Sequence, residues 1–226
     1  MALLDYTRRA MLAAGTATAI ALSAISVTAQ TPDDVLVVGQ IAEPKALDPA
    51  AVTAVNDFRI LMNLYDGLVR YKDGTLEVEP ALATSWNISN DGTEYTFSLR
   101  QGVKFHDGSD FNADAVKFNF DRMLDEAHPY HNTGPFPLSF FFSAIVSVDV
   151  LDPMTVKFTL NAPYAPFLSN LAYPTGLIVS PDAVAKHGTN FGRNPSGTGA
   201  FKFGEWRSNE AVVVEANSSH WEGAPK

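Results

Sequence analysis

A histidine, an aspartate and a serine stand close together in the segment His106-Asp107-Gly108-Ser109. A serine activated by a histidine that a carboxylate orients is the arrangement of a nucleophilic hydrolase. Adjacent residues on one turn do not supply that spatial triad, and the chain contains no Gly-x-Ser-x-Gly segment. We interpret the segment as a polar turn, and the sequence predicts no enzyme.

A second group of histidines, His128 and His131, has a spacing at which both rings could contact one metal ion. Pro129 separates them and Gly134 follows shortly after, so the segment is not a preformed helix face. No third ligand stands near, and the chain has no cysteine. We therefore predict a solvated loop with no metal, and no other cofactor is indicated.

A Gly-x-Gly element lies in the stretch NPSGTGAFKFGEW, residues 194–206. A loop that wraps a phosphate needs backbone N–H groups at the start of a helix. Residues 201–203 and 211–216 instead have the pattern of strands on either side of a turn at residues 207–210. This context does not support a phosphate-binding loop at Gly197, Thr198 and Gly199, and the residues alone leave the role of the loop open.

Three side chains are candidates for contact with a ligand. Tyr130 and Phe136 lie in a loop rich in proline and glycine, where an aromatic ring either faces a cleft or packs onto its own domain. Glu43, beside Pro44, follows an apolar stretch; its carboxylate is either solvated or meets an amino group of a ligand. The residues alone leave these alternatives open.

The elements that must position these side chains form an α+β (mixed α/β) pattern. Strands are predicted at residues 35–38, 94–99, 146–150, 155–160 and 177–179, and a hairpin is predicted to continue from 94–99 into Val103 and Phe105. The twin patterns Tyr95-Thr-Phe97-x-Leu99 and Val156-Lys-Phe158-x-Leu160 predict two strands of one sheet.

Helices are predicted where apolar residues recur at helical spacing. One carries Phe58, Leu61, Met62 and Tyr65, and a second begins at the N-cap Asn112. The buried stripe of the second helix contains Val116, Phe120, Met123 and Leu124. Residues 166–173 and a short segment from Pro181 complete the set.

Composition excludes several classes of protein. The chain of 226 residues is 46% hydrophobic, enough to bury a core, and its formal net charge of -9 argues against nucleic acid or an anionic membrane surface as a partner. The absence of cysteine excludes disulfides, zinc–thiolate sites and a lipid-modified cysteine.

Residues 1–29 have the order of a secretory signal: Arg8 and Arg9, an uncharged apolar run, and a small-residue site ending at Ala29. A retained anchor helix is the alternative, because the run is nearly long enough to span a membrane. The start of the segment resembles a twin-arginine signal, although Ala13 departs from that pattern. We predict export and cleavage, by either the Tat or the Sec route.

A series of motifs in a fixed order resembles the dipeptide/oligopeptide family (family 5) of extracellular solute-binding proteins that serve ABC importers. The motifs are Glu43-Pro-Lys-Ala-Leu-Asp-Pro49, Tyr65-Asp-Gly-Leu68, Pro80-Ala-Leu-Ala-Thr-Ser-Trp86, Asp91-Gly-Thr-Glu-Tyr-Thr-Phe97, Leu99-Arg-Gln-Gly-Val-Lys-Phe-His-Asp-Gly108, Asn112-Ala-Asp-Ala-Val116, Ala165-Pro-Phe167, Asn194-Pro-Ser-Gly-Thr-Gly199 and Trp221-Glu-Gly-Ala-Pro-Lys226. The resemblance covers essentially the whole chain after the leader.

This resemblance implies a class II periplasmic binding protein-like fold that is bilobal in the full-length family and incomplete here. It implies a main lobe at residues 30–60 and 176–226, with a small second domain at residues 61–175. Segments like Glu43-Pro44 border the ligand cleft in that family, and a tyrosine like Tyr130 reaches the ligand. The resemblance then implies a structural loop or hinge at Gly197, Thr198 and Gly199, at the re-entry from the small domain into the main lobe, where the glycines permit backbone conformations that a Cβ would disfavour.

The same resemblance implies the partners: a peptide or peptide-like solute and the ABC permease subunits in the membrane, with a monomeric full-length form in the periplasm. Chains of this family continue past the Trp-x-Gly-x-Pro-Lys motif into a second ligand-binding lobe. We therefore expect a truncated chain with little solute affinity by itself and an exposed apolar surface. Sugars, opines, glutathione or nickel chelates remain alternative solutes, and an exported hydrolase or peptidase, or a chaperone-like secreted domain, remains the alternative class.

Overall fold

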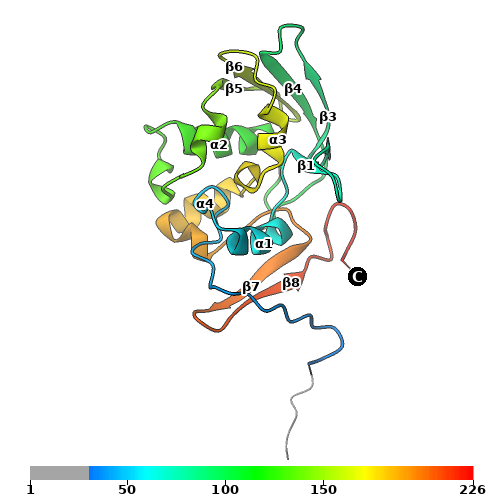
Figure 1. The fold of residues 1–226 in the computed structure, drawn as a ribbon, viewed down its shortest axis with the longest axis vertical. Helices are drawn as coiled ribbons and strands as arrows, with labels where there is room; N and C mark the ends of the chain where they lie inside the picture. The colour runs from blue at the N-terminus through cyan, green and yellow to red at the C-terminus, as the bar shows by residue number, and fades with distance from the viewer. Residues whose placement is uncertain (1–30, 226) are drawn as a thin grey trace, which may run out of the picture. The chain divides into compact units, whose positions relative to one another are not determined.

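The computed structural model describes residues 31–225, so the predicted signal peptide at residues 1–29 lies outside the described residues. The described residues fall into two units, divided between Gly39 and Gln40. The described part of the first unit, residues 31–39, contains no helix or strand. All elements named below belong to the second unit (Figure 1).

Helices form where the sequence predicts them. The α-helices are α1 (Val55–Leu64), α2 (Ala113–Leu124), α3 (Phe167–Ala172) and α4 (Pro181–His187), and the 3₁₀ helices are η1 (His131–Thr133), η2 (Ser139–Phe142), η3 (Pro174–Gly176) and η4 (Gly188–Arg193). Asn112 caps α2 as predicted, since its side chain accepts a hydrogen bond of 2.9 Å from the Ala115 N–H. On α1 the expected stripe is buried at Phe58 and Leu61, while Met62 is exposed.

The strands are β1 (Val69–Tyr71), β2 (Val78–Pro80), β3 (Ala83–Ile88), β4 (Glu94–Leu99), β5 (Ile145–Asp152), β6 (Thr155–Leu160), β7 (Phe201–Arg207) and β8 (Ala211–Ala216). They form an antiparallel sheet in the order β3-β4-β6-β5 and two separate two-stranded pairs, β1-β2 and β7-β8. The twin patterns are neighbours in the sheet, with Tyr95 opposite Phe158 and Phe97 opposite Val156, which confirms that prediction.

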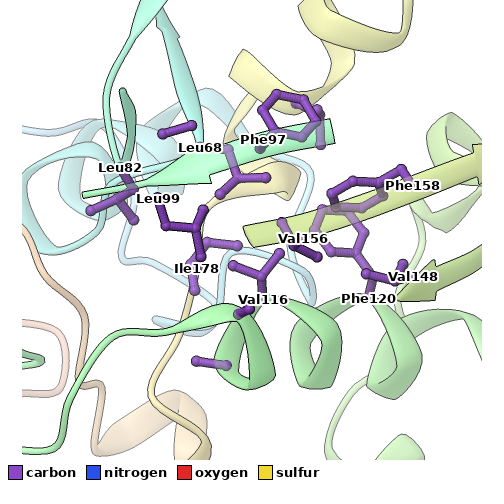
Figure 2. Close-up of a cluster of buried hydrophobic side chains, with 14 of the residues drawn as sticks. Leu68, Leu82, Phe97, Leu99, Val116, Phe120, Val148, Val156, Phe158 and Ile178 are labelled. Carbon is purple, nitrogen blue, oxygen red and sulfur yellow. The ribbon is translucent and has the colours of Figure 1, made fainter. Parts of the chain in front are cut away.

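The larger hydrophobic core, here called the sheet cluster, forms where α2 and α3 pack on one face of the four-stranded sheet. Its centre contains Leu68, Leu82, Phe97, Leu99, Val116, Phe120, Val148, Val156, Phe158 and Ile178 (Figure 2). Alternate residues of β4 and β6 point into it because successive side chains of a strand face opposite sides. The rings of Phe120 and Phe158 meet edge to face with centroids 4.9 Å apart.

A second core, here called the ribbon cluster, joins α1, α4 and η4 to the β7-β8 ribbon. Its buried members are Leu47, Val52, Phe58, Leu61, Leu64, Tyr65, Val179, Ala183, Val184 and Phe191, and Phe203, Trp206, Val212 and Val214 of the ribbon pack partly buried against them. In Figure 1 the sheet and the ribbon lie at opposite ends of the second unit, with α1 and α4 between them. The mixture of helices and antiparallel strands confirms the α+β class.

Three predicted strand features are wrong. Residues 35–38 form no strand, and Leu36 is 87% exposed, because none of the described strands pairs with them. Val103 and Phe105 are buried but form no hairpin with β4, since β3 and β6 already occupy both of its edges. Residues 177–179 contribute only an isolated bridge between Leu177 and Gly67.

The reason predicted for the glycines of the 194–206 loop is also different from the observed one. Gly197 and Gly199 do not have a positive φ. A Cβ on Gly197 would lie 2.2 Å from the carbonyl oxygen of Leu64, and one on Gly199 would lie 2.5 Å from that of Asn63. Close approach to the end of α1, and not an unusual backbone conformation, requires glycine here.

Candidate functional site

The loop that carries Glu43, defined here as the Glu43 loop (residues 43–49), is held rigidly by the ribbon cluster. The Leu47 N–H donates to the Gly192 carbonyl at 2.8 Å, and the buried Tyr65 hydroxyl donates to the Leu47 carbonyl at 2.6 Å. The Lys45 N–H donates to the Asp57 carboxylate at 3.1 Å. A loop with three anchors presents its remaining side chains in a defined arrangement.

Asp48 and Arg122 form a buried ion pair beneath this loop. The Arg122 guanidinium donates to both carboxylate oxygens of Asp48, at 2.9 Å and 3.2 Å, and the two side chains are 1% and 2% exposed. Such a two-point contact fixes orientation as well as distance. Arg122 belongs to α2, so this pair ties the Glu43 loop to the helix that covers the sheet.

The same guanidinium holds the segment of Tyr130, defined here as the Tyr130 segment (residues 128–136). Arg122 donates to the Thr133 hydroxyl at 3.1 Å, and that hydroxyl donates to the Tyr130 carbonyl at 2.7 Å. A Cβ on Gly134 would lie 3.1 Å from the Cβ of Ala51, which shows how closely this segment approaches the chain after the Glu43 loop. The two segments predicted to contact a ligand therefore meet at one buried cation.

Glu43 projects from its loop and is exposed. Its carboxylate accepts a hydrogen bond of 2.7 Å from the Trp206 indole, and the Arg193 guanidinium stacks on that indole at 3.4 Å from the ring centre. The hydrogen bond from Trp206 is the main cause that holds the pKa of Glu43 below its usual value. The structure thus places a charged carboxylate at the N–H edge of an indole whose face carries a cation, while the adjacent Pro44 is buried.

Tyr130 is half-buried, and its ring lies against the rings of Phe118 and His128 with centroids 5.7 Å and 5.9 Å away. No hydrogen bond joins Tyr130 to Glu43 or Pro44. Phe136 is only 4% exposed and lies under the Arg122 guanidinium, so of the two open alternatives this ring packs onto its own domain.

Arg122 and Asp48 were missed at the level of sequence. The signal for Arg122 was its position between Phe120 and Met123, two apolar residues of the predicted stripe of α2. A charged residue on a buried stripe requires a partner of opposite charge. The partner, Asp48, lies 74 residues away in the sequence, and no local pattern connects the two.

The polar turn at His106, Asp107 and Ser109 is structural, as predicted. Both ring nitrogens of His106 form hydrogen bonds to the backbone of the 194–206 loop. Its Nε2 lies 3.0 Å from the Gly199 carbonyl, and its Nδ1 accepts from the Gly197 N–H at 3.3 Å. Burial lowers the pKa of this histidine. Ser109 donates to Asp107 at 2.5 Å instead of to the histidine. These contacts leave no imidazole nitrogen free to activate the serine.

An open cavity of about 520 Å³ lies beside that turn, lined by residues that include Lys186, His187 and Lys202. None of Glu43, Pro44 and Tyr130 lines it. Within residues 31–225 no group of three histidines and carboxylates is placed to hold a metal ion. In the same part of the chain no helix has the length and apolar character needed to cross a bilayer.

Comparison with known proteins decides the family. Residues 77–226 match the model of the bacterial extracellular solute-binding proteins, family 5, middle region. The chain belongs to this family. The family 5 chain is 38% identical over 219 residues to di/tripeptide-binding protein 2 of Pseudomonas aeruginosa, with 89% of the chain and 41% of the relative covered.

Two further comparisons agree. The glutathione-binding protein GsiB of Pectobacterium atrosepticum is 36% identical over 227 residues, with 100% of this chain and 42% of that protein covered. The structure of the ABC transporter-associated periplasmic binding protein DppA of Helicobacter pylori, in complex with the peptide STSA, superimposes with a TM-score of 0.72 at 38% identity and covers 80% of this chain. This family 5 chain thus spans 38% to 42% of the length of these proteins.

Proposed function

We propose that this chain acts within a solute-binding component of an ABC importer that takes up peptides or peptide-like solutes. The match to family 5 over residues 77–226 carries the proposal. The relatives and solved structures similar to this chain bear names and titles that include di/tripeptide-binding and glutathione-binding proteins and a complex with a peptide.

The geometry supports a ligand-contacting role for Glu43, Pro44 and Tyr130. Two segments that are far apart in sequence contact the same buried Arg122, which holds the exposed Glu43 and the half-buried Tyr130 in a defined arrangement. Preorganised side chains bind a ligand with less loss of conformational entropy. A carboxylate beside an aromatic ring suits an amino group of a peptide-like solute.

The proposed domain division keeps residues 30–60 and 176–226 in a main lobe and residues 61–175 in a small domain. The ribbon cluster supports it, because Leu47, Phe58, Val184 and Phe191 come from the two outer segments. The first boundary falls inside α1 (Val55–Leu64), whose buried residues pack in the ribbon cluster. The loop at Gly197, Thr198 and Gly199 then forms the joint between the two parts.

Export to the periplasm through a cleavable signal at residues 1–29, and delivery of the solute to membrane permease subunits, complete the proposal. The order of charged, apolar and small residues in that segment supports export. Membership in an extracellular solute-binding family supports the location.

Mapping by nuclear magnetic resonance tests the proposed site, since chemical-shift changes report weak as well as tight binding. Dipeptides, tripeptides, glutathione and an opine are titrated into the ¹⁵N-labelled chain. We expect at least one peptide-like solute to move the signals of the Glu43 loop and the Tyr130 segment. Glu43→Gln and Tyr130→Ala should each weaken that response.

Two matched variants serve as controls: Glu126→Gln removes another exposed carboxylate, and Phe140→Ala removes an aromatic ring that is 61% exposed. Neither should change the response. Shifts confined to the cavity around Lys186 and Lys202 would place solute binding elsewhere, and the absence of any shift with every solute of the panel would contradict solute binding by this chain itself.

A further inference from the structure

The segment that follows β8, residues 217–225, returns to the turn after α1 and is fastened there by its side chains (Figure 1). Asp66, the residue on which these contacts converge, lies between α1 and β1. Its Oδ2 accepts from the Thr198 hydroxyl at 2.8 Å and from the Trp221 indole at 2.9 Å. Asp66 is therefore in contact with both the 194–206 loop and the end of the chain.

This returning segment spans the two hydrophobic cores. Asn217 is anchored to the 194–206 loop, since its N–H donates to the Ala200 carbonyl and its side chain donates to the Gly199 carbonyl. Four residues later Trp221 packs against the sheet cluster, where the Arg100 guanidinium lies 4.3 Å from its ring centre. Residues 217–225 thus connect the ribbon with the sheet.

His220 is the unusual member of this segment. Its side chain is 7% exposed, and its Nε2 is a buried nitrogen with no hydrogen-bond partner among the described residues. The nearest opposite charge to Nε2 is Oδ2 of Asp66, at 3.8 Å, and the other nitrogen, Nδ1, lies 3.3 Å from the Gly223 carbonyl. Both ring nitrogens therefore face oxygen acceptors.

A neutral imidazole carries one N–H and can satisfy only one of two acceptors. If Nδ1 donates to Gly223, the lone pair of Nε2 faces the negative charge of Asp66. Protonation supplies the second N–H and a positive charge beside that carboxylate. The geometry by itself favours the imidazolium.

We propose that His220 is a protonation-dependent latch, which fastens residues 217–225 to Asp66 at the joint between the ribbon cluster and the sheet cluster. This role is separate from solute binding and does not depend on the proposed function. The latch closes when His220 is charged and loosens when it is neutral.

The electrostatic environment of the two side chains agrees in direction with this geometry. The Asp66 carboxylate raises the pKa of His220, although burial opposes the shift. Burial alone would raise the pKa of Asp66, but the contacts from His220, Trp221 and Thr198 outweigh it and leave that pKa below its usual value. Each group therefore favours the charged state of the other.

Other ionisable groups lie around the latch. Glu222 pairs with Arg70 of β1 at 2.7 Å and helps to raise the pKa of His220. Arg100 covers Trp221. His106 faces Asp66 from the opposite loop, and burial lowers its pKa, so it is neutral where His220 is still charged.

The sign of the pH dependence follows from these directions. A histidine whose pKa is raised by folding contributes stability that is fully present below about pH 6.5 and is lost as the pH rises through its native pKa. The carboxylate of Asp66 contributes stability above about pH 3.9, which is lost as the pH falls through its lowered native pKa. The latch is therefore tightest in the mildly acidic range between these limits.

The test is a titration of the full 226-residue chain between pH 5 and pH 9, with two readouts. The imidazole Cε1–H resonance of His220 gives its pKa, and hydrogen exchange of the Trp221 indole N–H gives the opening of the latch. We expect a pKa above about 6.5, and a pKa one pH unit above that value corresponds to about a tenfold increase in opening across the titration.

Three variants distinguish opening of the latch from a general loss of protein stability. Asp66→Asn should return the pKa of His220 to about 6.5 or below. His220→Gln should make the protection factor of the Trp221 indole N–H, its exchange rate relative to the intrinsic rate at each pH, independent of pH over the same range. This test does not require Asp66→Asn to fold correctly. His187→Gln, which changes a histidine on α4, is the control and should leave the Trp221 titration unchanged.

The proposal is overturned if His220 titrates at or below about 6.5 in the wild-type chain. It is also overturned if exchange at Trp221 has the same pH dependence with and without the imidazole of His220. Neither outcome would bear on the proposed solute binding, which is measured at other residues.

Discussion

The sheet cluster and the ribbon cluster reach similar burial by different routes. In the sheet cluster, β3 pairs with β4 and β5 with β6, so two hairpins of adjacent strands supply most of the face that α2 covers. The ribbon cluster collects Leu47, Leu61, Val184 and Phe191 from segments far apart in the chain. The first depends on local pairing and the second on contacts between distant segments.

The two regions also differ in how they are joined to the rest of the molecule. Arg122 of α2 lies at the boundary, where its guanidinium contacts Asp48 of the Glu43 loop. Gly197 and Gly199 lie against the end of α1 with no space for a side chain. If these contacts make one cooperative unit of the two clusters, changes at the boundary should destabilise both together.

The largest effect is expected for Arg122→Met. Removing the cation leaves the Asp48 carboxylate buried and unpaired, which should cost about 3 to 5 kcal/mol of unfolding free energy. Urea unfolding followed by circular dichroism measures it. A single unfolding transition at a lower urea concentration would show that the two clusters unfold together. Two separate transitions would contradict that interpretation.

Two further variants check the cause. Arg207→Met removes an arginine whose partners Glu205 and Glu210 are exposed, and it should leave the midpoint nearly unchanged. Combining Arg122→Met with Asp48→Asn should recover part of the loss, because the buried charge is then gone. An Arg122→Met chain as stable as Arg207→Met would contradict a structural role for the pair.

Gly199→Ala should have the next largest effect. The added Cβ would lie 2.5 Å from the Leu64 carbonyl carbon and 2.7 Å from the Tyr65 nitrogen, so the loop or α1 must move. We expect a loss of about 1 to 3 kcal/mol, measured by thermal unfolding. Gly39→Ala is the control, since a Cβ there meets nothing within 4 Å. Equal melting temperatures for the two variants would show that the joint is not closely packed.

Helix capping offers a smaller and more local comparison between the clusters. Asn112 caps α2, and replacing it with alanine should cost about 1 kcal/mol. Helix α1 begins at Val55, and its N-cap residue Ala54 has no side chain that can cap it, so Ala54→Ser should stabilise the chain by up to about 1 kcal/mol. Urea unfolding should shift in opposite directions for the two variants; a loss of stability in Ala54→Ser would show that its added hydroxyl cannot reach the N–H groups of α1.

The smallest expected effect is a local change with pH in the contact between the exposed Glu43 and Trp206. Because the pKa of Glu43 is lowered, its contact with Trp206 should persist as the pH falls below 4.5 and be lost only as the pH passes through the lowered native pKa. Fluorescence of Trp206, isolated by subtracting the spectrum of Trp206→Phe, measures the transition. Glu43→Gln should abolish it, while Glu126→Gln should not; a transition that survives Glu43→Gln would assign it to another group.

Local patterns predicted much of the sheet cluster. Alternation in residues 94–99 and 155–160 gave the strands and their inward faces, and Asn112 gave the start of α2. The failures have one cause. Residues 35–38 and 177–179 form strands only if other strands pair with them, and a new hairpin with β4 requires a free edge on that strand. No short window of sequence contains these pairing partners.

The candidate site divides in the same way. Motif order indicated the family and drew attention to Glu43, Pro44 and Tyr130, whose contact with a solute stays a prediction. It did not indicate Trp206 as the partner of Glu43, which lies 163 residues away. It also gave no sign that one guanidinium holds both candidate segments.

The sequence by itself determined the α+β class, the positions of the α-helices and most strands, and membership in a solute-binding family. Periodicity and motif order are visible along the sequence before the chain folds. Only the tertiary structure decided which charges are paired and why particular glycines are required. Asp48 with Arg122, Asp66 with His220, and Gly199 against α1 are all contacts between distant residues. Their energies depend on burial and distance, which exist only after the chain has folded.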